Sequence, residues 1–142
     1  MEIVTLPSLT PEDIRNEVAH IIGWLRERNL TELEMMHGVG CGSTGAEWLT
    51  AKVALENLDE LIAQSESEGL FRPSRSDLWI MTQEHDIDNN PKIQFRLCHE
   101  ADIHVVSADA ELLDVVKAHW LENGWRGYQG TGGKGCEWTA FP

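Results

Sequence analysis

Residues 77–97 read DLWIMTQEHDIDNNPKIQFRL, and they decide the fold class because their apolar residues have the spacing of strands rather than of a helix. The run Leu78–Met81 is apolar on both faces, which is typical of a central strand. Ile93, Phe95 and Leu97 alternate with polar residues, as in a half-buried strand. The segment between the two runs is rich in Asp and Asn and is a predicted turn. The chain is therefore expected to contain a sheet.

The carboxyl-terminal part continues this pattern with one helix and more strands. Residues 103–106 predict a third short strand. Asp109 is the predicted N-cap of a helix that ends before Gly124. Beyond it, the glycine-rich GTGGKG at 130–135 lies between WRGYQ and CEWTAF, which predicts a hairpin.

The amino-terminal half predicts three helices. A hydroxyl N-cap, a proline and two acidic residues open the first helix, over about 10–28. Capping-box spacing opens two more, over 31–38 and 44–69, and each ends at a glycine.

These elements predict one α+β domain over residues 1–142, in the order α-α-α-β-β-β-α-β-β. We expect the helical amino-terminal half to pack on a small antiparallel or mixed sheet. The length is the commonest for a single domain, and no linker-like segment divides the chain.

Several features indicate a cytoplasmic protein with no membrane segment. The longest apolar run, Leu78–Met81, is far shorter than the roughly 20 residues that a membrane helix needs. The amino end lacks the basic and apolar segments of a secretory signal. The three cysteines, Cys41, Cys98 and Cys136, are odd in number and widely spaced, which suits reduced thiols in a reducing compartment.

The charge balance gives the leading functional hypothesis. The chain has 24 acidic and 11 basic residues, for a formal net charge of −13. This excess disfavours direct nucleic-acid binding, which depends on Lys and Arg, and favours a basic protein partner. We expect a small acidic protein-interaction domain that binds, with or without inhibiting or neutralising, a basic or nucleic-acid-handling protein.

Two groups of residues are expected to contact such a partner. The first is acidic and includes the residues opposite the apolar stripe of the predicted third helix. The second is a pair of tryptophans beside the glycine-rich hairpin loop. The seven residues are Glu32, Glu34, Glu56, Asp59, Glu60, Trp125 and Trp138.

The Gly38–Gly45 loop supports an alternative function, a small enzyme or small-molecule-binding domain that uses Cys41 and His37. The loop contains the pattern GxGxxG, but the dinucleotide fingerprint needs a strand before it, and the preceding segment is a predicted helix. A thiolate is stabilised near a helix start, and His37 is close enough to act as a base. No third orienting group is evident, so a structural Cys41 and a non-enzymatic protein are favoured.

Five residues have the chemistry of zinc ligands: His85, Cys98, His99, His104 and Cys136. Cys98 and His99 are adjacent, so a regular strand would point them to opposite faces. No pair has the close ligand spacing of a zinc module. We therefore expect no metal site and no other cofactor.

Overall fold

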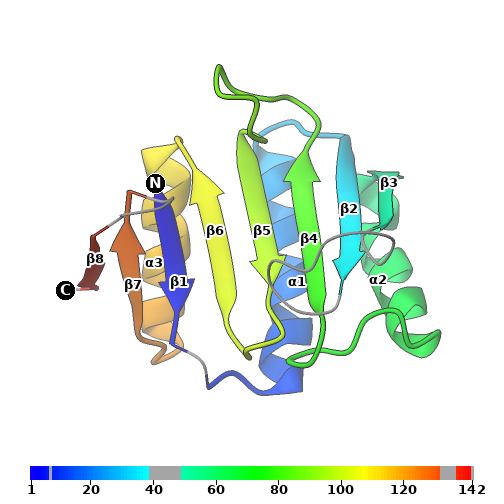
Figure 1. Cartoon of the computed structure of the whole chain (residues 1–142), viewed down its shortest axis with the longest axis horizontal. Coiled ribbons are helices and arrows are strands. Elements are labelled where there is room, and N and C mark those ends of the chain that lie inside the picture. Colours follow the sequence, from blue (N-terminus) through cyan, green and yellow to red (C-terminus); the bar gives the residue numbers. More distant parts are fainter. Residues whose placement is uncertain (7, 39–48, 132–136, 142) are drawn as a thin grey trace.

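The computed structural model describes residues 1–6, 8–38, 49–131 and 137–141. Within these residues, eight strands form one antiparallel sheet in the order β3-β2-β4-β5-β6-β1-β7-β8 (Figure 1). The strands are β1 (Glu2–Thr5), β2 (Glu32–Gly38), β3 (Leu49–Ala54), β4 (Asp77–Thr82), β5 (Ile93–Leu97), β6 (Ile103–Ser107), β7 (Gly127–Gly130) and β8 (Trp138–Ala140).

The helices cover one face of this sheet, behind it in the view of Figure 1. They are α1 (Pro11–Glu27), the short 3-10 helix η1 (Leu55–Asn57), α2 (Leu58–Ser67) and α3 (Ala110–Glu122). None of the helices in the described part of the chain has the length and apolar character that a membrane span requires.

Two of these helices begin where their capping residues predict. In α1 the Thr10 hydroxyl accepts a hydrogen bond from the Asp13 amide at 3.1 Å, and the Asp13 carboxylate accepts one from the Thr10 amide at 2.9 Å. In α3 the Asp109 carboxylate accepts from the Leu112 amide at 3.0 Å. Both caps satisfy backbone donors that have no partner inside the helix.

The expectation of a three-helix amino-terminal half on a small sheet is wrong. Residues 2–5 form β1, and the segment predicted as the second helix is strand β2. In the predicted third helix, residues 49–54 form β3, and only α2 is α-helical among the described residues. The sheet therefore takes three strands from the half expected to be helical.

The apolar residues of β2 have a spacing that fits both a helix and a strand. Leu33 and Met36 are three residues apart, as on a helix face, yet Leu33 and Met35 are buried with the half-buried Glu34 between them, as on a strand. Pairing decides between the two, because β2 hydrogen-bonds to β3 on one side and β4 on the other. Ladder bonds on both sides outweigh a weak local helix preference.

The first strand, β1, lies between two strands from the carboxyl-terminal part of the chain. β1 pairs antiparallel with both β6 and β7, so the amino terminus lies inside the sheet rather than at its edge. β7 pairs in turn with β8, which confirms the strands of the predicted hairpin, while its loop at 132–136 lies outside the described residues.

The core lies between the sheet and the helices. One row of buried apolar side chains crosses five neighbouring strands in register: Met35, Ile80, Phe95, Val105 and Ile3. Trp24 of α1 stacks on Phe95 with ring centroids 6.2 Å apart. At the other end of the sheet, Trp120 of α3 stacks on Phe141 at 6.1 Å.

Candidate functional site

The predicted acidic residues gather at the β3–β2 end of the sheet. Glu32, Glu56, Asp59 and Glu60 are exposed, and we call these four the acidic corner. The start of β2 and η1 adjoin there, because the Leu55 amide donates to the Thr31 carbonyl at 2.9 Å. Glu34 is set apart from the corner: it is half-buried within β2, in register with Lys52 of β3.

A groove of about 400 Å³ borders the acidic corner. Its lining combines apolar residues with two residues of opposite charge, Arg26 and Glu56. The groove is lined by Arg26, Leu30, Thr31, Ala54, Leu55 and Glu56.

The two predicted tryptophans lie on different sides of the sheet. Trp125 is half-buried against the core on the helix side, with its ring centroid 6.4 Å from that of His119. Trp138 lies on β8 and is 43% exposed. It is in register with Gly130, and through it with Glu2, which places it on the face away from the helices. The two rings therefore do not form one surface.

The alternative site is only partly described. Cys41 and most of the Gly38–Gly45 loop lie outside the described residues. His37 belongs to β2 and shares a hydrogen bond of 3.0 Å with the Ser65 hydroxyl of α2. Burial lowers the pKa of His37, so the ring is neutral at neutral pH.

The argument that Cys98 and His99 point to opposite faces is wrong, because Cys98 follows the end of β5 and a tight turn replaces the strand there. The Cys98 sulfur lies 3.6 Å from His99 Nδ1. The Asp77 carboxylate accepts from the His99 amide at 2.8 Å and lies 3.1 Å from its Nδ1. Cys136 lies outside the described residues, and His85 is exposed in the β4–β5 connection.

A polar row crosses the face of the sheet away from the helices. The Arg96 guanidinium lies over the Trp79 ring, 5.0 Å from its centroid. His104 is held between Glu2 at 2.9 Å and Asp102 at 3.1 Å. Burial opposes its charge, but hydrogen bonds led by that to Asp102 outweigh it and raise the pKa of His104 to about 10. The charge of His104 is thus neutralised within the protein.

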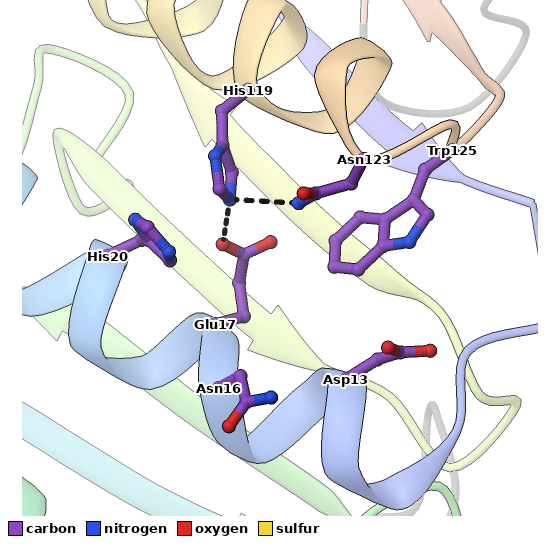
Figure 2. Close-up of a pocket in the computed structure, with 7 residues that line it drawn as sticks. All are labelled: Asp13, Asn16, Glu17, His20, His119, Asn123 and Trp125. Atoms are coloured by element: carbon purple, nitrogen blue, oxygen red, sulfur yellow. Dashed lines mark hydrogen bonds and ion pairs between the residues drawn. The ribbon is translucent and has the colours of Figure 1, made fainter.

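A second cluster, which the sequence did not predict, joins α1 to α3. Glu17 of α1 shares a hydrogen bond of 2.7 Å with Nε2 of His119 on α3, and its other carboxylate oxygen accepts from the Trp120 indole at 3.0 Å. The ring of His20, one helical turn after Glu17, lies 4.1 Å from the His119 ring, centroid to centroid. Figure 2 shows the side chains of Glu17, His20 and His119 converging between the two helices.

This cluster borders a cavity of about 310 Å³. Polar side chains of α1 line one side of the cavity, and the Trp125 ring lies on the α3 side with His119 and Asn123 (Figure 2). It is lined by Asp13, Asn16, Glu17, His20, His119, Asn123 and Trp125.

Glu17 is the unusual group of the cluster, because its carboxylate is only 1% exposed. Burial raises the pKa of Glu17 to about 7, although nearby His20 and the Trp120 hydrogen bond oppose the rise. Burial also lowers the pKa of His119. Both shifts favour the neutral forms of Glu17 and His119, whose side chains are joined by the 2.7 Å hydrogen bond.

The sequence carried a signal of this site. Glu17 falls between Ile14, Val18 and Ile21, within the apolar stripe of α1, where a solvated carboxylate is not expected. A charged residue in such a stripe indicates a buried partner. The spacing of residues could not show which residue of the distant α3 contacts Glu17.

No protein-family model, curated protein or solved structure matches this chain.

Proposed function

We propose that the protein is a small acidic interaction domain that binds a basic protein at the acidic corner. The observation that carries this proposal is the clustering of four exposed carboxylates, Glu32, Glu56, Asp59 and Glu60, beside a partly apolar groove. Such a surface complements a Lys or Arg side chain, whose aliphatic stem packs on apolar groups while its charge meets the acids.

The rest of the surface is consistent with this choice, because four of its cations are already paired with acids of the same chain. Within the described residues, four Lys or Arg side chains form ion pairs, and none of these pairs includes a residue of the acidic corner. They are Arg15 with Glu66, Arg28 with Asp109, Lys92 with Glu84, and Lys117 with Asp114. Each of these pairs removes one acid with each cation, so the excess of 24 acidic over 11 basic residues remains and favours the approach of a basic protein.

A basic or nucleic-acid-handling protein fits this surface better than a nucleic acid does. Phosphates would be repelled by the excess of carboxylates, whereas a protein that itself binds nucleic acid exposes Lys and Arg. Occupying that basic surface would neutralise or inhibit the partner. We place this interaction in the cytoplasm, in keeping with a chain of three widely spaced cysteines.

The test compares two triple charge reversals after the partner has been captured from the native host. The first is Glu56→Lys, Asp59→Lys and Glu60→Lys. The matched control is Glu12→Lys, Glu111→Lys and Glu122→Lys, whose side chains are also exposed and whose change in formal charge is the same. Association rates are measured by stopped flow over a series of ionic strengths.

The corner variant should associate about 10-fold more slowly at low salt and lose most of its salt dependence, since exposed charges are screened beyond about 8 Å at physiological ionic strength. The control should keep most of the wild-type rate. Equal slowing of both variants would mean that only net charge matters, and unchanged association of the corner variant would place the interface elsewhere.

A further inference from the structure

We propose that Glu17, His20 and His119 form a binding site for one divalent transition-metal ion, with zinc the best fit. One carboxylate oxygen and two imidazole nitrogens, one from each residue, all lie within 4.8 Å of one another. They come from two helices that the sheet holds side by side, and they face the cavity in Figure 2.

The donor set matches zinc chemistry. Zinc binds imidazole nitrogen and carboxylate oxygen, and sites with three protein ligands keep a further position for water. Softer ions would prefer thiolates, and calcium or magnesium would prefer oxygen ligands alone. The cavity of about 310 Å³ gives that water room.

The backbone already sets most of the geometry. Glu17 and His20 are three residues apart on α1, so they lie on one face of the helix. Tetrahedral zinc with bonds of roughly 2.0–2.1 Å needs ligand atoms about 3.3 Å apart. Glu17 Oε1 and His119 Nε2 are 2.7 Å apart, so a small side-chain rotation that separates these two atoms opens the site.

A neighbouring residue orients the carboxylate. The Trp120 indole N–H donates to Glu17 Oε2 at 3.0 Å, which leaves Oε1 directed at His119. Trp120 is fully buried, so this donor is held in place by the core. Outer hydrogen bonds of this kind hold ligands in orientation at metal sites.

Charge and access also favour a cation. A buried carboxylate is costly when ionised, and a divalent ion compensates that charge better than a neutral histidine does. His20 is exposed and His119 is partly exposed, so the ion has a path from solvent. Asp13 at the cavity edge is engaged in the cap of α1 and is not counted among the ligands.

A competing cluster lies at the other side of the sheet. Cys98, Asp102 and His104 also approach within 4.8 Å of one another. Cys98 and Asp102 are buried, however, and His104 is already held between two carboxylates. Both ring nitrogens of His104 are engaged by carboxylates, whereas His20 is exposed and only the contact of Glu17 with His119 has to open, so Glu17, His20 and His119 are the better site.

The test is calorimetric titration of ZnCl₂ into the full chain after treatment with a chelator. The wild type should bind one Zn²⁺ with micromolar affinity at this site. His20→Ala is the principal variant because the His20 side chain is exposed, so its removal takes little buried surface from the fold. His119→Gln is the second variant, and both should weaken binding at least about 10-fold.

Two controls locate the ion. His85→Ala removes an exposed histidine far from the cluster in the fold, and Cys98→Ser removes the thiol of the competing cluster; neither should change the affinity. Co²⁺ bound in place of Zn²⁺ should show no thiolate charge-transfer band. The proposal is overturned if the wild type binds no zinc, if His20→Ala and His119→Gln bind as the wild type does, or if His85→Ala or Cys98→Ser abolishes binding.

Discussion

Replacing Glu17 with Gln should remove a pH-dependent loss of stability. The pKa of Glu17 is about 7 in the folded protein against 4.5 for the ordinary carboxyl group. Between these values the folded state binds a proton that the unfolded state has lost. The contribution of Glu17 to stability is therefore fully present below about pH 4.5 and is lost as the pH rises through about 7.

The size of the loss follows from the shift. Each pKa unit corresponds to about 1.4 kcal/mol, so a rise from 4.5 to about 7 amounts to about 3 kcal/mol for this buried side chain. The Gln side chain has the same shape and stays neutral. Its amide oxygen can accept from the Trp120 indole, and its amide nitrogen can donate to His119, so both contacts of Glu17 persist.

The assay is urea unfolding of the wild type and Glu17→Gln between pH 5 and pH 9, with a chelator present. The free energies of unfolding should be similar near pH 5, and the variant should become the more stable by about 3 kcal/mol above pH 8. The ionisable residues that surround Glu17 in the cavity, Asp13, His20 and His119, are present in both proteins, so their effects largely cancel in the difference. A difference that does not change with pH, or one that favours the wild type at pH 8, would refute the reasoning.

Two further predictions concern the sheet. Since the pKa of His104 is raised to about 10, its contribution to stability is present below about pH 6.5 and is lost as the pH rises through 10. Wild-type stability should therefore fall between pH 7 and pH 10, and His104→Gln, measured by urea unfolding, should be less stable at pH 7 and show a flatter profile. Phe95→Ala should cost about 3–5 kcal/mol, because Phe95 is fully buried under Trp24 in the middle of the core row. A thermal midpoint of Phe95→Ala within a degree or two of the wild type would show that this row of side chains contributes little to stability.

Local signals predicted the elements that local interactions stabilise. The caps of α1 and α3 form within three residues of the chain, so Thr10, Asp13 and Asp109 were readable from spacing alone. The alternation in β5 marks a face buried against helices, and it has the same register in the structure. The segment 31–38, by contrast, is predicted as a helix but forms β2, because its apolar spacing fits both periods and only its pairing with β3 and β4 decides between them.

The candidate sites divide in the same way. The acids of the acidic corner could be listed from the sequence, since charged side chains seldom lose contact with water and exposure is their ordinary state. Their closeness to one another depends on η1 adjoining the start of β2, which no short-range pattern encodes. Trp125 and Trp138 show the opposite outcome: they flank one hairpin in the sequence, yet they lie on different sides of the sheet.

By itself, the sequence determined the charge of the surface, the starts of α1 and α3, and the strands β4, β5 and β6, because these depend on composition and on neighbours a few residues away. Tertiary structure alone decided that β1 lies between β6 and β7, and that Glu17 meets His119 across 102 residues of chain. The physical reason is that ladder bonds and buried polar pairs gain their strength only when distant segments exclude water together.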